Sequence, residues 1–151
     1  MLIGILEHEH FSEEALSLLD TLGEVVKFET GDINKFLRDL DVLFIRLNYY
    51  IGNDFLKKCK NLKYVCSPTT GLIHIDLNIL AKKNISLISL RGEKAFLKNV
   101  HAAAEHTFCL ILSLLRGMNI YNNDIKAYNC NRMLFLGDEL NCKKVGFIGF
   151  R

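Results

Sequence analysis

The chain has 151 residues, of which half are hydrophobic and 24% are charged, as in an ordinary globular domain with a sizeable core. Its net charge of only +2 argues against a nucleic-acid-binding protein and against binding to an acidic membrane surface. Five Cys, with no C-x-x-C pair, and an N-terminus without a secretory leader predict a protein of the reducing cytoplasm.

Short apolar runs alternate with capped helical patterns along the first 90 residues. Continuous apolar runs of this length are typical of strands buried on both faces, and they cover residues 2–6, 25–28, 42–45, 63–66 and 85–90. Helices are predicted between them, three of which begin at the capping residues Ser12, Asp32 and Asp76. Strict alternation predicts an α/β fold, a flavodoxin-like doubly wound sheet of five parallel strands in the order 2-1-3-4-5.

The second part of the chain is organised around a long helix predicted at 99–116. Its first half is rich in Ala, and its second half is apolar on all sides, as in a helix that is normally buried all round. A further helix is predicted at 120–127, a polar connector at 128–140, and a buried strand at 144–149 that ends in Gly, as a dinucleotide-binding unit begins. We therefore expect a substrate domain at 1–95 and, at 96–151, an inter-domain helix, a connector and the first strand of a truncated Rossmann domain.

The carboxyl ends of the strands are where open α/β sheets bind ligands, and this rule selects the candidate site. Strands three and four are expected to be neighbours, so Arg46 would face the turn at 69–71. A guanidinium beside hydroxyls and free backbone N–H groups can bind a carboxylate. The alternative is that Arg46 is a solvent-exposed strand end and Gly71 an ordinary turn glycine.

Three other groups of polar residues favour structural roles. His74 is expected to be a loop histidine that holds a backbone carbonyl, and Glu105 with His106 lacks a nucleophile or second acid at a suitable spacing. His8 and His10 would share one face of an extended strand, but two ligands without a third do not predict a metal site.

A phosphoacceptor receiver domain has the same predicted fold but requires a different residue. It needs an Asp at the end of the third strand, where this chain has Arg46. The receiver interpretation is therefore rejected.

Three motifs carry a resemblance to a known family. They are TGLIHID at 70–76, NVHAAAEHT at 99–107 and VGFIG at 145–149. In their order and spacing they resemble the N-terminal part of the NAD-dependent D-isomer-specific 2-hydroxyacid dehydrogenases, the group that includes D-3-phosphoglycerate, D-lactate and formate dehydrogenases. These motifs are specific for the family and leave the particular 2-hydroxy acid open.

The resemblance implies roles for six positions. Thr70 and Gly71 would offer backbone N–H groups to the substrate carboxylate, and Arg46 would help to hold it or a substrate phosphate. Asn99 stands at a substrate-binding position. Ala103 would lie against the nicotinamide of NAD, and Gly149 matches the first Gly of the phosphate-binding loop.

The departures from the family pattern are equally informative. Arg151 stands where the second Gly of the phosphate loop belongs, and no residue matches the family's catalytic Arg, Glu or His. Those residues come from the second domain of the family, where they support hydride transfer between nicotinamide and the substrate. We expect these 151 residues alone neither to bind NAD appreciably nor to be active, and the alternative is a non-catalytic binding or interaction module derived from the family. The side of the 99–116 helix that carries Phe108, Leu112 and Leu115 is expected to be exposed or buried against another copy of the chain, which predicts a homodimer or other self-association.

Overall fold

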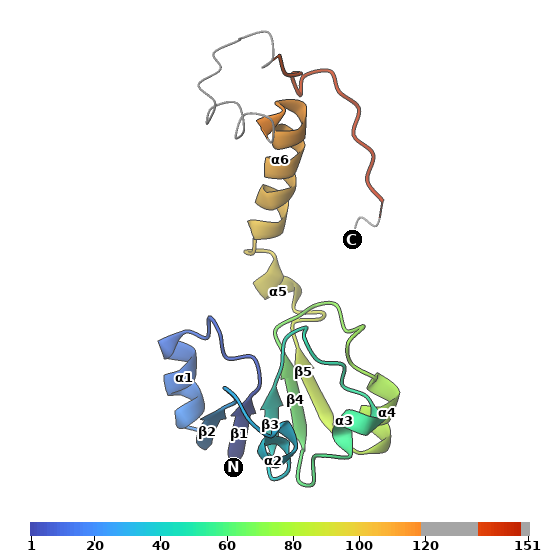
Figure 1. Cartoon of the computed structure of the whole chain (residues 1–151). Helices are drawn as coiled ribbons and strands as arrows, with labels where there is room; N and C mark the ends of the chain where they lie inside the picture. Colours follow the sequence, from blue (N-terminus) through green and yellow to red (C-terminus); the bar gives the residue numbers. More distant parts are fainter. Residues whose placement is uncertain (119–135, 149–151) are drawn as a thin grey trace. The chain divides into compact units, whose positions relative to one another are not determined.

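The computed structural model describes residues 1–118 and 136–148 of the chain, which divides into two units, residues 1–94 and 95–151. The first unit contains a five-stranded sheet whose strands are all parallel, in the order β2-β1-β3-β4-β5 (Figure 1). The strands are β1 (Leu2–Ile5), β2 (Glu24–Lys27), β3 (Val42–Phe44), β4 (Tyr64–Ser67) and β5 (Ser86–Ser89). The predicted fold and strand order are confirmed.

The helices of this unit begin largely where the sequence places their caps. They are α1 (Glu13–Asp20), α2 (Ile33–Leu37), α3 (Asn53–Leu56) and α4 (Leu77–Lys82). The Ser12 hydroxyl accepts the N–H of Ala15 at 3.1 Å, and Asp32 and Asp76 accept N–H groups in the first turns of α2 and α4. Each cap satisfies a donor that the helix itself leaves unpaired, which explains why these boundaries are predictable from local sequence.

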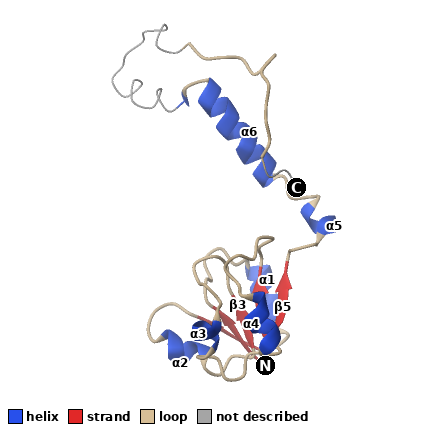
Figure 2. Ribbon diagram, turned by 90° about the vertical axis from the view of Figure 1, so that its right-hand side faces the viewer, coloured by secondary structure: helices blue, strands red, loops and turns tan. Residues whose placement is uncertain are grey.

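Two apolar cores cover the two faces of the sheet. On one face Leu43 and Val65 pack with buried leucines of α2, α3 and α4. On the other face Ile3, Val42 and Cys66 pack with a residue of α1. Figure 2 shows α4 on the near side of the strands and α1 on the far side. This division follows from right-handed crossovers, which put the helix that precedes β2 on the opposite face from the three that follow.

The second unit contains α5 (Lys94–Leu97), whose first residue lies at the boundary, and the longer α6 (Ala102–Leu115). The predicted helix at 99–116 is therefore confirmed in its body but wrong at its start. Asn99 instead lies in the turn after α5, where its N–H donates to the carbonyl of Phe96 at 3.1 Å. No residue of α6 is buried. Phe108, Leu112 and Leu114 are 58%, 45% and 82% exposed, whereas Leu115, the third residue of the predicted self-association side, is half-buried.

The strand predicted at 144–149 is not formed in the part of it that the structure describes, residues 144–148. Val145 and Ile148 are exposed there. A strand is stabilised by pairing with a neighbour, and the described residues supply none at this position, so the apolar pattern alone does not make a strand. The predicted helix at 120–127 and most of the predicted connector lie outside the described residues, as does Gly149.

The segment 136–148 forms a hydrogen bond with the end of α6. The N–H of Asp138 donates to the carbonyl of Leu115 at 2.8 Å, and Lys143 forms an ion pair with Asp138 at 3.2 Å. Within the described residues, no helix is both long enough and apolar enough to cross a membrane.

Candidate substrate-binding site

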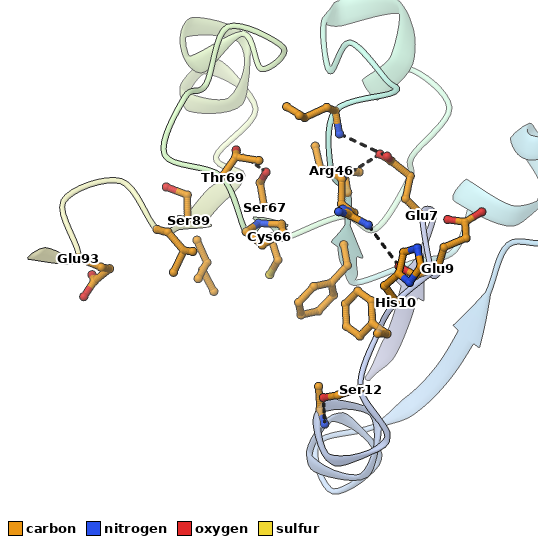
Figure 3. A pocket seen from close by; sticks show the side chains of 18 residues that line it. Glu7, Glu9, His10, Ser12, Arg46, Cys66, Ser67, Thr69, Ser89 and Glu93 are labelled. Atoms are coloured by element: carbon orange, nitrogen blue, oxygen red, sulfur yellow. Dashed lines mark hydrogen bonds between the residues drawn. The ribbon is translucent and has the colours of Figure 1, made fainter. Parts of the chain in front are cut away.

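A cavity of about 790 Å³ lies at the carboxyl edge of the sheet, within the first unit. Its walls come from the carboxyl ends of β3, β4 and β5, from the segments that follow these strands and β1, and from the start of α1. Figure 3 shows Glu9 and His10 on the side of Arg46, and Ser89 and Glu93 on the far side of Ser67 and Thr69. The site therefore lies where the topology of an open parallel sheet predicts it.

The buried carboxylate of Glu7 organises one wall of this cavity. It accepts the backbone N–H of Arg46 at 2.7 Å and those of Leu47 and Asn48 at 3.3 Å each. These hydrogen bonds tie the segment after β1 to the segment after β3, because the two strands are neighbours in the sheet. A carboxylate that accepts three N–H groups is well satisfied despite its burial, so Glu7 has a structural role here.

The side chain of Arg46 is exposed and lines the cavity together with Thr69. One guanidinium nitrogen, Nη1, donates to the backbone carbonyl of Glu9 at 3.3 Å, which leaves most of its N–H groups for other partners. Arg46 and the loop after β4 thus line the same cavity, the arrangement expected from the strand order.

Thr70 and Gly71 form the exposed tip of the loop after β4. Within the described residues, neither of their backbone N–H groups has a hydrogen-bond acceptor. Free N–H groups at the carboxyl edge of a sheet can bind an anion, because they offer hydrogen bonds without a competing acceptor. Neither residue lines the cavity itself, so these donors lie at its margin.

A chain of side-chain contacts fixes the base of the same loop. The buried Ser67 Oγ lies 2.9 Å from Thr69 Oγ1, which donates to the carbonyl of Gly71 at 2.9 Å. Ser67 Oγ also lies 3.4 Å from Nε2 of the buried His74. The expectation that the His74 ring holds a backbone carbonyl is wrong, because the ring contacts this hydroxyl instead.

Cys66 also lines the cavity. Burial raises the pKa of its thiol to about 11, since the thiolate would lose its hydration there. Cys66 therefore stays a neutral thiol near neutral pH.

The first strand ends at Ile5, so His8 and His10 are not on one face of an extended strand as expected. His10 has a backbone φ of 64°, in a turn. Across residues 1–118 and 136–148, no group of three or more His, Cys, Asp or Glu side chains could hold a metal ion.

The other predicted site residues belong to the second unit. Asn99 precedes α6, and Ala103 lies in its first turn, where its carbonyl accepts the hydroxyl of Thr107 at 2.8 Å. Both are exposed. Their assignment to substrate and cofactor remains a prediction.

Sequence reasoning missed two structural residues of the site, Glu7 and Ser67. Glu7 directly follows an apolar run, and a carboxylate at that position is a signal for a group that binds free N–H groups at a strand end. Its donors lie about 40 positions along the chain, so only the pairing of β1 with β3 reveals them.

The family model of the D-isomer-specific 2-hydroxyacid dehydrogenase catalytic domain matches residues 5–139. The chain belongs to this family. The family that the three sequence motifs predict is therefore confirmed, and it is a family of oxidoreductases. The receiver-domain interpretation stays rejected.

Among the relatives, D-3-phosphoglycerate dehydrogenase of Bacillus subtilis is 29% identical over 83% of this chain and 23% of its own length. Erythronate-4-phosphate dehydrogenase of Shewanella loihica is 31% identical over 74% of this chain and 28% of its own length. The chain thus spans about a quarter of the length of these curated dehydrogenases.

Solved structures of the family share the fold. D-lactate dehydrogenase of Aquifex aeolicus, determined with NAD and lactic acid, superimposes with a TM-score of 0.74 over 92% of this chain and 41% of its own, at 20% identity. Formate dehydrogenase of Staphylococcus aureus, determined with NAD, gives a TM-score of 0.69 at 22% identity, over 89% of this chain and 44% of its own.

Proposed function

We propose that this chain is the substrate-binding part of an NAD-dependent D-2-hydroxyacid dehydrogenase. Residues 1–95 would form the substrate domain, which closely matches the first unit of the structure. Residues 96–151 would supply the inter-domain helix, the connector and the opening of the NAD-binding domain. The cytoplasm is the expected location.

The observation that carries this proposal is the placement of Arg46 and Thr69 in one cavity beside the unpaired N–H groups of Thr70 and Gly71. A 2-hydroxy or 2-keto acid presents a carboxylate, which such donors bind through charge-assisted hydrogen bonds. In this proposal Arg46, Thr70, Gly71 and Asn99 hold the substrate.

The residues proposed for NAD suit a flat ring. Ala103 is exposed in the first turn of α6, and its methyl group leaves room for a nicotinamide to approach the helix closely. Ala103 would contact that ring, and Gly149 would approach the phosphates. When bound, NAD supplies the hydride acceptor of the family reaction, whereas this chain offers only surfaces for binding.

We further propose that the 151 residues alone bind a 2-keto acid but do not reduce it, since none of them matches the family's catalytic Arg, Glu or His. The exposed apolar side chains of α6 support a homodimer or other self-association through residues 99–116.

Titration of the 15N-labelled chain with pyruvate, followed by NMR, tests the binding proposal. We expect shifts of the Thr70 and Gly71 amide signals and an affinity about tenfold weaker in Arg46→Gln, because a charge-assisted hydrogen bond is lost. Arg38→Gln is the matched control, because Arg38 is also exposed but pairs with Asp39 outside the cavity. NADH oxidation should stay at the background rate.

Three results would contradict the proposals. Absence of any amide shift at saturating pyruvate removes the substrate site. An equal loss of affinity in both arginine variants shows that binding is not centred on Arg46. Turnover of pyruvate or another 2-keto acid by the purified chain contradicts the proposed inactivity.

A further inference from the structure

The loop after β4 is closed by a chain of hydrogen bonds whose direction can be assigned from the number of protons available. The Gly71 carbonyl can only accept, so the single hydroxyl proton of Thr69 is used in that contact. The Ser67 hydroxyl must then donate to Thr69 across their 2.9 Å contact. Ser67 Oγ is left as an acceptor, and the donor that faces it is Nε2 of His74, at 3.4 Å.

The other ring nitrogen supports the same assignment. His74 Nδ1 is buried and has no hydrogen-bond partner among the described residues. A proton there would be an unpaired buried donor. The geometry therefore favours a ring proton on Nε2, which faces the Ser67 oxygen.

The backbone of His74 is anchored on the opposite side. Its carbonyl accepts the N–H of Ile51 at 2.8 Å, and the N–H of Asp76 donates to the carbonyl of Ile51 at 3.0 Å. Ile51 and Ile75, which form a parallel bridge, are both fully or nearly buried. The ring of His74 thus connects this fixed backbone to Ser67, the last residue of β4.

We infer that His74 is a positioning residue: its Nε2–H orients the Ser67–Thr69–Gly71 hydrogen bonds and so holds the loop in the shape that exposes the N–H groups of Thr70 and Gly71. The inference rests on the proposed function, in which those N–H groups bind the substrate carboxylate. His74 does not line the cavity, so it acts through the loop and does not touch the ligand.

The first test observes the proton itself. Long-range proton–nitrogen NMR correlations of the 15N-labelled chain should show His74 as the Nε2–H tautomer, with an Nε2 proton that exchanges slowly with water. This slow exchange should be lost in Ser67→Ala. An Nδ1–H tautomer, or unchanged exchange in Ser67→Ala, would overturn the inference.

The second test measures the consequence for binding. His74→Leu and Ser67→Ala should each weaken pyruvate binding about tenfold, near the upper end of what one neutral hydrogen bond contributes. His74→Gln, which keeps an amide donor near the position of Nε2, should restore most of the affinity. If the role of His74 is purely structural, the loss of pyruvate affinity in His74→Leu and in His74→Gln should instead follow the loss in the free energy of unfolding of each variant.

The outcomes separate this inference from the proposed function. A folded His74→Leu chain that binds pyruvate as tightly as the unmodified chain overturns the role of His74 alone. If the unmodified chain binds no pyruvate, the proposed function fails and the binding role of His74 fails with it. The tautomer measurement then still decides the assigned hydrogen-bond chain.

Discussion

The two units of the chain use apolar residues in opposite ways. In residues 1–94, side chains such as Leu43 and Val65 are completely buried between the sheet and its helices. In α6, which is at least as apolar, no residue is buried. A five-stranded sheet with helices on both faces buries its own apolar surface, whereas a single helix that is apolar all round needs a partner to do so. An apolar sequence therefore indicates that its side chains favour burial, but it does not identify the element or partner that covers them.

The largest effect is expected from truncating the buried leucine of β3. Leu43→Ala should lower the free energy of unfolding by about 3 kcal/mol, because it removes buried methyl groups and leaves a cavity. Leu114→Ala is the matched variant in α6, where the side chain is 82% exposed. This variant should change the free energy of unfolding by less than about 0.5 kcal/mol. Urea denaturation of the full chain, kept dilute, measures both.

Equal destabilisation by the two leucine variants would contradict the comparison, because α6 would then be packed as tightly as the sheet. A small effect of Leu43→Ala on the free energy of unfolding would show that the core around Leu43 is not what stabilises the first unit.

Sequence reasoning succeeded where the signal is local. The caps at Ser12, Asp32 and Asp76 bind N–H groups two or three residues ahead, and the strand runs carry their own apolar pattern. It failed at 144–148, the described part of the strand predicted at 144–149, where the same apolar pattern lacks a neighbouring strand among the described residues. It also missed α5 and placed the start of α6 three residues early, because helix ends depend on capping and packing.

The features of the site likewise divide into those that the sequence predicts and those that only the folded structure reveals. The edge of the sheet and the nearness of Arg46 to the loop after β4 follow from strand order, which the alternation of elements predicts. The partners of Glu7 and His74 could not be predicted, because each depends on contacts between segments that only the folded sheet brings together.

The reactivity of two cysteines provides a second test of the comparison between the two units, with an expected effect of intermediate size. Cys109 lies exposed in α6, and Cys66 is buried against the sheet with a pKa raised to about 11. In dilute solution at pH 8, iodoacetamide should modify Cys109 at least about tenfold faster than Cys66, because the Cys109 thiol is accessible to the reagent, whereas Cys66 is buried and its raised pKa disfavours the reactive thiolate. Mass spectrometry of peptides separates the two sites.

Protein concentration then tests whether α6 is covered by another copy. If α6 self-associates, modification of Cys109 should slow at high concentration, while Cys66 serves as an internal reference. Leu112→Glu should abolish this protection, and Leu18→Glu, at an exposed leucine of α1, should not. A concentration-independent rate for Cys109, with a monomer by sedimentation, would remove the proposed homodimer.

The smallest effect is expected at the edge of the sheet opposite the site. Asp41 accepts a hydrogen bond from Lys63 Nζ at 2.8 Å and another from the N–H of Leu2 at 2.9 Å, and these bonds, with Lys63 first, lower the pKa of its carboxyl below 3.8. The same contact raises the pKa of Lys63 above 10.5. The pair joins the starts of β1, β3 and β4, but its exposure to solvent limits its contribution.

The sign of the pH dependence follows from these shifts. A carboxyl whose pKa is lowered in the folded chain stabilises it above the unfolded pKa of 3.8, and this contribution is lost as the pH falls through the folded value. An amine whose pKa is raised stabilises the fold below 10.5, and this is lost as the pH rises through its folded value. The contribution of the pair should therefore be constant between about pH 5 and 9 and decline outside that window. In Asp41→Asn the acid decline should become shallower. Lys57 also lowers the pKa of the exposed Asp54 carboxyl in α3, so Asp54→Asn should act in the same direction. Its effect should be smaller, because Asp41 accepts the backbone N–H of Leu2 in addition to its lysine. Identical acid profiles for the unmodified chain and Asp41→Asn, measured by urea denaturation, would show that this edge of the sheet is held by its backbone hydrogen bonds and core alone.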